Sequence, residues 1–323
     1  MTGISPFQVK SFAFEVGFDL CGITTPEPIP RASESFKRWL GLDMHGEMEY
    51  LASDPERRTN PAGVMPSVKS IIMLGLNYHS EDSVPAVAEL GKVSRYARGK
   101  DYHKIIEKKT KRLIRRIRDW VGPDNPCEMR WFVDYGPMLE RSYAERAGLG
   151  FIGKNSMLIS RQFGSWLFLS EILTDLELPP DDRHLVNHGR CGKCTRCVDA
   201  CPTGAIVADH VVDSRKCISY LTIERPSEIP PELSRKMGNL VFGCDICQEV
   251  CPHNGRAVLT RHKDLLPESG VGETIPTREI LAMNSRDEFL KLTAGTPLTR
   301  TKLDGLKRNA AIVLHNSRSE ADS

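Results

Sequence analysis

The sequence predicts an α+β fold in three parts. These are a leading α+β domain of residues 1–178, a small cysteine-rich domain of residues 179–260, and a short helical C-terminal segment of residues 261–323. Three observations predict this division. Strand-like apolar runs mix with helical periodicity before residue 175, eight of the ten cysteines fall within 191–251, and two helical patterns follow them. At 323 residues, the chain is long enough for about two domains with separate cores.

The leading part contains three apolar runs that are typical of buried strands. They are VKSIIMLGLNY at 68–78, EMRWFVD at 128–134 and SWLFLSEILTD at 165–175. After the second run, a turn at Gly136 and Pro137 precedes MLERSYAERAG at 138–148, which is predicted to be a helix that ends at a glycine.

A long basic helix is predicted at 103–120. Its apolar residues recur at helical spacing, and they are Ile106, Leu113, Ile117 and Trp120. The same segment carries eight Lys or Arg residues. One face is therefore expected to pack and the other to be basic. The basic face is either a solvated helix surface or a contact surface for phosphates.

The rest of the chain is read from turn residues and helical periods. LELPPDDRH at 176–184 is a polar connector, and RPSEIPPELSRKMGN at 225–239 contains short helical pieces. Helices are predicted within 277–295 and 303–316. The polar tail SRSEADS at 317–323 is expected to be disordered.

Composition is that of a soluble protein, with 40% hydrophobic and 27% charged residues and a net charge of +2. The longest apolar stretch, SIIMLGL at 70–76, is far shorter than the roughly 20 residues of a membrane helix. The N-terminus carries no basic start followed by a long apolar run. We therefore expect a cytoplasmic protein without a membrane partner, in which clustered cysteines bind metal and do not form disulfides.

The run CGKCTRCVDACP at 191–202 places four cysteines in eleven residues before a proline. Its C-x2-C-x2-C-x3-C-P spacing is that of bacterial ferredoxins, in which three thiolates hold one four-iron cluster and the fourth reaches a second cluster. A second group, GCDICQEVCP at 243–252, ends in the same way, and Cys217 stands alone between the two groups. The sequence therefore predicts a ferredoxin-like domain with two [4Fe-4S] clusters.

In this motif the fourth cysteine of each run binds the cluster that the other run holds, and this rule defines two ligand sets. The predicted sets are Cys191, Cys194, Cys197 and Cys251 for one cluster, and Cys201, Cys217, Cys244 and Cys247 for the other. Two zinc sites are the alternative, because four thiolates also suit tetrahedral zinc. Two Cys-Pro endings with interleaved fourth ligands favour the clusters. Cys21 and Cys127 lie outside both motifs and are expected to be ordinary buried thiols.

Asp134 ends an apolar strand and precedes a turn, and two interpretations are open. An aspartate in this position is often a helix N-cap or a turn former. In a partly apolar pocket, the pKa of the same carboxyl would be raised, so that it could deliver a proton. The following GLGFIGKN at 148–155 lacks the G-x-G-x-x-G spacing, and no Walker sequence occurs, so nucleotide cofactors are not indicated.

Four stretches together resemble the epoxyqueuosine reductase family. They are RRTNP at 57–61, SRYARGKDYHK at 94–104, FVDYGPMLERSYAERAGLGFIGKN at 132–155 and KCISYLTIE at 216–224. The resemblance runs from about Phe7 to Asn316. It implies a cobalamin-dependent iron–sulfur oxidoreductase that performs the last step of queuosine biosynthesis on tRNA.

The resemblance also implies roles for single residues. Asp134 corresponds to the proton donor. The expected cobalamin contacts are Arg57, Tyr96, Ala97, Asp134, Lys154, Asn155 and Ser219. Without the resemblance, Arg57 would be read as a surface residue, Lys154 and Asn155 as a loop turn, and Tyr96 as a core aromatic. No role is assigned to His103.

The implied reaction converts the epoxide of epoxyqueuosine in the tRNA anticodon loop to the alkene of queuosine, with electrons from an external donor such as a flavodoxin or ferredoxin. Two alternatives remain. A corrinoid reductive dehalogenase would share the clusters and the cobalamin domain, and a ferredoxin-type electron carrier would share only the clusters. Family members commonly continue into HEAT-like helical repeats, and LKRNAAIVLHN at 306–316 resembles a first, truncated helix of such repeats.

Overall fold

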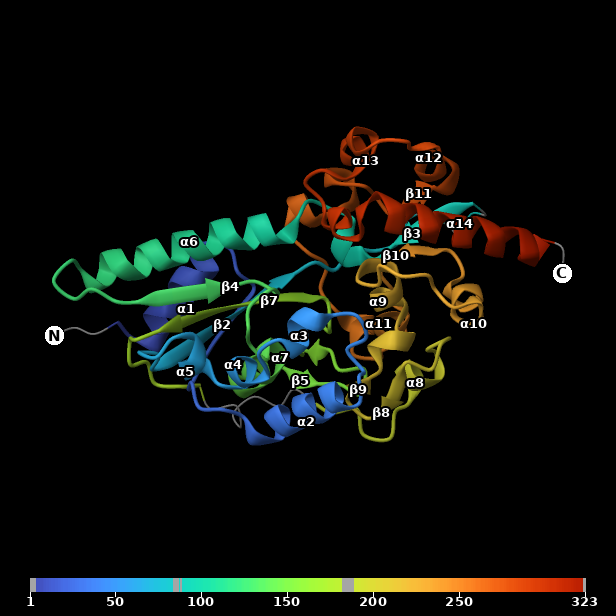
Figure 1. The fold of residues 1–323 in the computed structure, drawn as a ribbon. Helices are drawn as coiled ribbons and strands as arrows, with labels where there is room; N and C mark the ends of the chain where they lie inside the picture. The colour runs from blue at the N-terminus through green and yellow to red at the C-terminus, as the bar shows by residue number, and fades with distance from the viewer. Residues whose placement is uncertain (1–3, 84–86, 88, 182–188, 322–323) are drawn as a thin grey trace.

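The computed structural model describes residues 4–83, 87, 89–181 and 189–321. A four-stranded antiparallel sheet with the order β1-β2-β7-β4 forms the centre of the leading part (Figure 1). Its strands are β1 (Leu20–Thr24), β2 (Ser70–Asn77), β7 (Leu167–Thr174) and β4 (Met129–Phe132). The three predicted strands are therefore confirmed, and they lie next to one another in one sheet.

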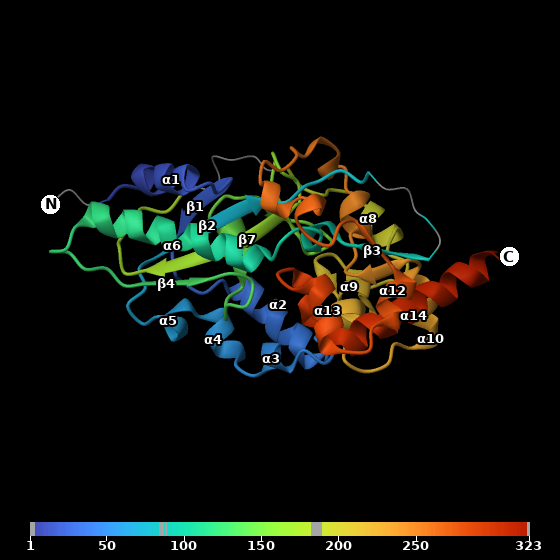
Figure 2. The same ribbon diagram turned by 90° about the horizontal axis from the view of Figure 1, so that it is seen from above.

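Helices cover both faces of this sheet. The helices are α1 (Pro6–Glu15), α6 (Tyr102–Val121), α5 (Pro61–Val64) and α7 (Glu140–Arg146). Helices α1 and α6 pack on the face that carries Ile72 and Leu74, as the view in Figure 2 also shows. Helices α5 and α7 pack on the opposite face, with Ile71 and Met73. Because both faces are covered, β2 is buried along its whole length, which explains its continuous apolar sequence.

The amphipathic pattern of α6 is confirmed at three of its four apolar positions. Ile106, Leu113 and Ile117 are buried in the core beneath the helix. Trp120 was expected on the same packed face, but it is 52% exposed. The indole lies in the last turn of α6 and contacts Phe12 edge-on, with ring centroids 5.8 Å apart. The rest of the ring is exposed to solvent, because few residues surround the end of the helix.

A second sheet takes one strand from each of the three parts. Strand β3 (Leu90–Val93) lies in the centre, β10 (Leu240–Phe242) pairs with it in parallel, and β11 (Thr274–Pro276) pairs with it antiparallel. Backbone hydrogen bonds therefore join the three parts, in addition to the loops between them.

The cysteine-rich region consists of short elements. They are α8 (Arg196–Asp199), β8 (Ile206–Ala208), β9 (Val211–Val212), α9 (Ile218–Ile223), α10 (Pro231–Ser234) and α11 (Ile246–Glu249). Helices α8 and α11 each contain the last cysteine of a C-x2-C pair, Cys197 and Cys247, and they contact each other. The remaining elements of the leading part include α2 (Pro30–Gly41), α3 (Glu49–Ala52), α4 (Pro55–Thr59), β5 (Phe151–Ile152) and β6 (Leu158–Ile159).

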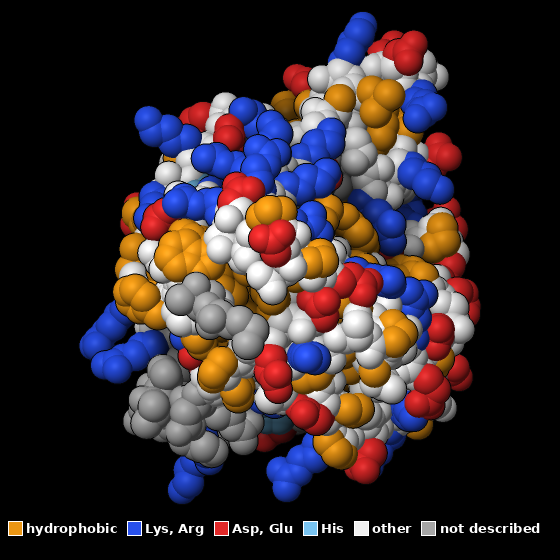
Figure 3. Space-filling model, turned by 90° about the vertical axis from the view of Figure 1, so that its left-hand side faces the viewer, with side chains coloured by type: hydrophobic (Ala, Val, Ile, Leu, Met, Phe, Trp, Pro, Cys, Tyr) orange, Lys and Arg blue, Asp and Glu red, His pale blue; other side chains and the backbone are white. Residues whose placement is uncertain are grey.

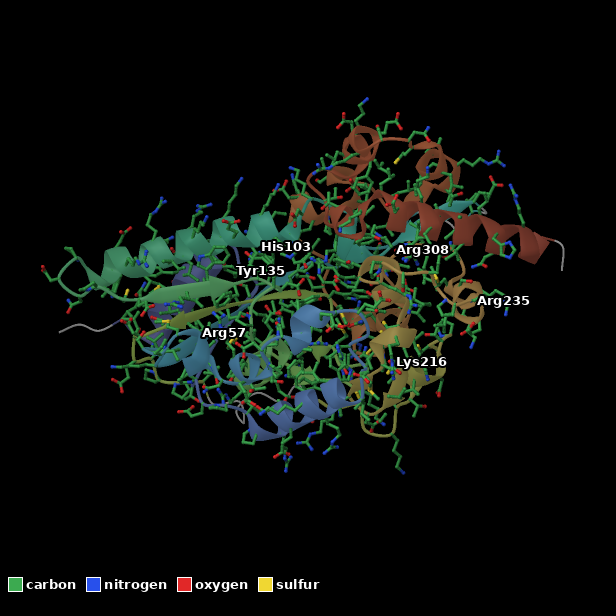
Figure 4. The ribbon with its side chains drawn as sticks, in the orientation of Figure 1. Arg57, His103, Tyr135, Lys216, Arg235 and Arg308 are labelled. Atoms are coloured by element: carbon green, nitrogen blue, oxygen red, sulfur yellow. The ribbon has the colours of Figure 1, made fainter. Side chains whose placement is uncertain are left out.

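The C-terminal segment packs on the cysteine-rich region. Its helices are α12 (Thr277–Ala282), α13 (Arg286–Thr293) and α14 (Lys302–Ala321). Leu306, Ala310 and Val313 of α14 are fully buried in the core that surrounds β10. Arg308 donates hydrogen bonds to the carbonyls of Leu221, Arg225 and Ser227 (Figure 4). The apolar face of α14 is therefore covered by this chain.

Two segments were predicted to lack regular structure, the C-terminal tail and the polar connector. The tail from residue 317 was expected to be disordered, but α14 continues to Ala321, and residues 322–323 lie outside the described part. Most of the polar connector at 176–184 is described as far as Asp181, and its last three residues lie outside the described part. Among the described helices, none combines the length and apolar character that a membrane span requires.

Candidate active site

A cavity of about 2870 Å³ lies between the central sheet and the cysteine-rich region. Its walls come from α2, α3, α7, β7 and α9, and from the loops that carry the cysteines. Pockets for drug-sized ligands measure roughly 300–1,000 Å³. This cavity therefore has room for a macrocyclic cofactor together with part of a large substrate.

Asp134 lies in the wall of this cavity, on the turn between β4 and α7. The N-cap of α7 is Leu139, which makes no side-chain capping bond, so the capping interpretation of Asp134 is wrong. The backbone of Asp134 has φ 62°, a left-handed conformation that few residues other than glycine adopt. Its N–H donates a hydrogen bond to Oε1 of Glu140 over 3.0 Å.

Two side chains of α6 face the carboxylate of Asp134. The hydroxyl of Tyr102 donates a hydrogen bond to Oδ2 over 2.5 Å, and Nε2 of His103 lies 3.7 Å from the same oxygen. Asp101, the N-cap of α6, lies 2.8 Å from Nδ1 of His103 and thereby orients the imidazole. The Asp134 side chain keeps 62% of its surface exposed, and this surface faces the cavity. Figure 4 shows His103 and Tyr135 close together at this point.

The proton in this group resides mainly on the histidine. The enclosure of Asp134 in the cavity wall alone would raise its pKa, but the nearby charged His103 and the hydrogen bond from Tyr102 outweigh this desolvation and lower it. Burial acts against the charged form of His103, yet its interactions with Asp101 and Asp134 raise its pKa to about 9. The expectation of a raised pKa at Asp134 is therefore wrong, because a cationic neighbour offsets the desolvation.

The structure brings four of the expected cobalamin contacts together with Asp134. Tyr96, Lys154, Asn155 and Ser219 all line the cavity. The backbone N–H of Lys154 donates to Sγ of Cys191 over 3.4 Å. The buried side chain of Asn155 donates to the carbonyl of Cys247, also over 3.4 Å. The loop of Lys154 and Asn155 therefore joins the cavity wall to both cysteine groups.

The other two expected contacts lie elsewhere. Arg57 is exposed on the one-turn helix α4 and lies apart from His103 and Tyr135 (Figure 4). Its neighbour Arg58 lines the cavity and donates a hydrogen bond to the carbonyl of Gly136 over 3.2 Å. Ala97 is fully buried in the core around β3. Adjacent residues of a helix point about 100° apart, so a shift of one position moves the guanidinium from solvent to the cavity.

The cysteines lie close to one another in two neighbouring groups, and their division into two ligand sets stays a prediction. Burial raises the pKa of the Cys197 thiol, and so do its neighbours Cys191 and Cys251. Burial likewise raises the pKa of Cys251, with further contributions from Cys191 and Cys194. Each member of this set is therefore close enough to another to interact with it.

The second set shows the same pattern. Burial raises the pKa of Cys244 to about 12, and Cys217 and Cys201 contribute to the increase. The pKa of Cys247 is also raised by burial and then by Cys244 and Cys217, with a smaller contribution from Cys197 of the first set. All four cysteines of this set line the cavity, whereas only Cys191 of the first set does.

Within the described residues, no three His, Cys, Asp or Glu side chains converge closely enough to hold a single metal ion. A cubane cluster does not need such convergence, because each thiolate binds a different iron atom. Cys21 lies in β1, where burial raises its pKa to about 12, and the half-buried Cys127 lies just before β4.

Comparisons with known proteins agree with this arrangement. Residues 58–135 match the family model described as "Epoxyqueuosine reductase QueG, DUF1730", and residues 190–254 match a "4Fe-4S double cluster binding domain". The chain is 42% identical to epoxyqueuosine reductase of Leadbetterella byssophila, over 95% of this chain and 97% of that protein. It is 41% identical to that of Pseudomonas aeruginosa, over 97% and 85% of the two chains.

The chain belongs to the epoxyqueuosine reductase family. A solved epoxyqueuosine reductase with an epoxyqueuosine-modified tRNA-Tyr stem loop superposes with a TM-score of 0.87 and 30% identity, over 98% of this chain and 82% of that one. The Bacillus subtilis enzyme gives a TM-score of 0.85 at 29% identity, over 98% and 82% of the chains, and has been solved with its catalytic aspartate loop swung out of the active site. Epoxyqueuosine reductases are oxidoreductases that depend on cobalamin and carry two [4Fe-4S] clusters.

Several residues of the site in this member of the epoxyqueuosine reductase family were not singled out from the sequence. They are Tyr102, His103, Arg58, Glu140 and Glu171. One signal was present, because Glu171 is a charged residue within an apolar strand, and such a residue is buried only with a partner. The other four lie in segments whose sequence predicts only a helix surface, and their place in the site is visible only from their contacts in the structure.

Proposed function

We propose that this protein reduces the epoxide of epoxyqueuosine in tRNA to the alkene of queuosine. Family membership supports the reaction. The observation that carries the proposal is the position of Asp134, which faces a large cavity, has a charged histidine as neighbour, and shares the cavity with all four cysteines of one cluster set. The proposed proton donor and the ligands of the cluster that would deliver electrons therefore line the same cavity.

The residues of the cavity fit the cofactors of the family. Tyr96, Arg58, Lys154, Asn155 and Ser219 would hold cobalamin, which when bound supplies a strongly reducing cobalt centre that no side chain can replace. Cys201, Cys217, Cys244 and Cys247 would hold the cluster next to the cofactor, because all four line the cavity. The cluster of Cys191, Cys194, Cys197 and Cys251 would then receive electrons from an external donor such as a flavodoxin or ferredoxin.

The protons follow from the balance of the reaction. Both carbon–oxygen bonds of the epoxide break, a carbon–carbon double bond forms, and the oxygen leaves as water after gaining two electrons and two protons. The epoxide oxygen would depart as an alkoxide, which is a poor leaving group until it is protonated. Asp134 is ionised at rest, so it must take up a proton before each of the two transfers. His103 is the group from which it takes the proton, since Nε2 lies 3.7 Å from Oδ2 of Asp134, and His103 is protonated again from solvent between the two transfers.

The two α6 residues and Asp101 have separate tasks in this scheme. Tyr102 fixes the carboxylate of Asp134 through its hydroxyl, and its ring stacks on Phe168 of β7 with centroids 4.0 Å apart. Asp101 holds His103 in the orientation that presents Nε2 to Asp134. In the Bacillus subtilis relative the catalytic aspartate loop swings out. By analogy, the Asp134 turn must be held in place when the substrate is bound.

The tRNA would be bound in part by α6. Lys and Arg side chains gather over the upper part of the face shown in Figure 3, where α6 lies. In the described part of the chain, Lys108, Arg112 and Arg115 are exposed on α6 and have no ion-pair partner, whereas Arg116 pairs with Glu15. Unpaired cations on a helix whose first turn lines the cavity suit the phosphates of the stem loop. A tRNA substrate and reduced cysteine ligands are also consistent with a cytoplasmic protein.

The test uses protein reconstituted anaerobically with iron, sulfide and cobalamin, then reduced chemically. We expect a synthetic anticodon stem loop that carries epoxyqueuosine to be converted to the queuosine form, which is lighter by one oxygen atom. Protein without cobalamin is the control. Failure to convert the stem loop, with dehalogenation of an aryl halide instead, would show that the substrate class is wrong. Absence of bound cobalamin would leave only an electron carrier.

A further inference from the structure

A buried acidic side chain lies behind the Asp134 turn and has no role in the scheme above. Glu171 is in the middle of β7 and is fully buried. It shares a sheet face with Leu169 and Leu173, because alternate residues of a strand point the same way. Its register partners are Phe132 on β4 and Met73 on β2, neither of which can compensate a charge.

The carboxyls of Glu171 and of Glu140 on α7 are close enough to interact with each other. Neither oxygen of Glu171 receives a hydrogen bond from a donor group of the described residues. Burial raises the pKa of Glu171 well above its usual range, and the neighbouring Glu140 raises it further. Burial and the charge of Asp134 raise the pKa of Glu140 to about 7. Two facing carboxyls in an apolar setting cannot both ionise cheaply, so one proton stays between them.

The Asp134 turn rests directly on these two carboxyls. Oε1 of Glu140 accepts the N–H of Asp134 over 3.0 Å, at the residue with the left-handed backbone. Gly136 lies so close above Glu171 that a Cβ at this position would be 2.9 Å from Oε1 and 2.5 Å from Cβ of Phe132. Glycine therefore allows the turn to approach the pair, and Glu140 holds the strained residue.

We propose that Glu140 and Glu171 act as one positioning pair, which shares a single proton and holds the Asp134 turn in its reactive position. This inference rests on the proposed function, because it assigns the pair to the reduction at Asp134. The pair does not touch the substrate, and it acts through the backbone of Asp134.

The charges around the pair make its grip on the Asp134 backbone, through the hydrogen bond to Glu140, dependent on pH. Asp134 from the turn, Arg141 from α7 and Tyr102 from α6 face Glu140, and Glu140 and Asp134 face Glu171. With one proton on the pair, the negative charges of the pair and of Asp134 are balanced by Arg141 and His103. Loss of that proton leaves two adjacent carboxylates beside a third, and repulsion then weakens the bond between Glu140 and the Asp134 N–H.

The test compares Glu171→Gln with wild-type holoenzyme. Gln keeps the size of the side chain and can donate to Glu140, but it removes the shared proton. In single-turnover reactions we expect the wild-type rate to fall at alkaline pH, where Glu171, whose pKa is raised well above its usual range by burial, loses the shared proton. The fall should be smaller in Glu171→Gln, which has no such proton to lose. Glu140→Gln should show the same smaller fall, since it removes the other member of the pair. Glu128→Gln, at an exposed carboxyl outside the cavity, should keep the wild-type profile.

A second measurement does not depend on turnover. Hydrogen exchange of the peptide that spans 132–140 is followed in holoenzyme at neutral pH and at alkaline pH, where Glu171 loses the shared proton. At the higher pH we expect faster exchange in wild type than in Glu171→Gln, and equal exchange at the lower pH. Glu140→Ala, which removes the acceptor, should exchange faster at both values and react about tenfold more slowly.

The outcomes separate this inference from the proposed function. If wild-type protein fails to reduce the stem loop, the proposed function is wrong, and the exchange experiment still decides whether the pair holds the turn. If wild type and Glu171→Gln have the same pH profile and the same exchange, the positioning pair is wrong while the function stands. Should Glu171→Gln not fold, Glu140→Gln carries the same comparison from the other side.

Discussion

His103 Nε2 lies 3.7 Å from Asp134 Oδ2, and this contact places a charged imidazole beside the carboxylate that faces the cavity. Because the pKa of His103 is raised to about 9 and that of Asp134 is lowered, the resting pair is an ion pair at neutral pH. In the proposed reaction, proton delivery therefore depends on two residues from different elements, the turn after β4 and the start of α6.

Asp134→Asn should separate the carboxyl's chemistry from its shape. Asn is nearly the same size and can still accept from Tyr102, so iron, cobalamin content and tRNA binding should be almost unchanged. It cannot deliver a proton, and general acid catalysis is worth about 10²–10⁴ in rate. We expect single-turnover reduction to slow at least about 100-fold, roughly 2.7 kcal/mol in the barrier. A near wild-type rate with pre-reduced enzyme would mean that another group donates the proton.

His103→Gln should change the alkaline side of the pH profile. Wild-type activity requires the His103 proton, so it should fall as pH rises through about 9, and this fall should be missing from the slower variant. The pKa is raised on folding, so the His103 contribution to stability is full below its ordinary pKa and is lost through about pH 9. Unfolding midpoints at several pH values test this. Equal midpoint differences between wild type and variant at all pH values would contradict the ion pair.

Cys217→Ala should remove one cluster and not both. Wild-type protein should contain about eight irons per chain after anaerobic reconstitution, and the variant about four, because Cys217 belongs to only one ligand set. Cys127→Ala, outside both sets, is the matched control and should keep the full content. About four irons in wild type, or zinc in their place, would overturn the assignment. Loss of both clusters in Cys217→Ala would show that the sets are structurally interdependent.

Charge reversal on α6 should weaken tRNA binding. Lys108→Glu combined with Arg112→Glu removes two unpaired cations, and the slope of log affinity against log salt should fall by about 1 for each phosphate that the helix no longer neutralises. Lys291→Glu on α13 is a control with the same kind of charge change on a different helix. Affinity and salt slope are measured with the modified stem loop. If the double variant matches the control, α6 is only a solvated surface.

Asn309→Leu should destabilise the region around Cys217. The fully buried Asn309 side chain of α14 donates to the carbonyls of Thr222 and Val241 over 2.8 and 3.0 Å. Leu leaves both carbonyls without this donor, at a cost of about 1–3 kcal/mol. We expect a lower thermal midpoint and loss of iron from the Cys217 cluster on heating before the other. A midpoint equal to that of Ala311→Leu, which places leucine on the exposed side of α14, would contradict this.

The elements and the presence of two clusters could be predicted because their signals are local. The runs that became β2, β4 and β7 are apolar over the length of a strand, and both faces of the sheet are covered, so nothing competes with that pattern. The cysteine spacing follows from the reach of a short loop around one cluster. The family resemblance then supplied the role of Asp134.

Only the tertiary structure decided which groups surround that residue. His103, Glu140 and Glu171 come from α6, α7 and β7, and their effects on the Asp134 turn arise from contacts across the sheet that no local spacing records. Whether Arg57 or Arg58 lines the cavity depends on which side of the single helical turn α4 faces it. Local sequence determines the elements, whereas the position of a proton depends on the summed field of charges that folding brings together, and that field exists only in the folded chain.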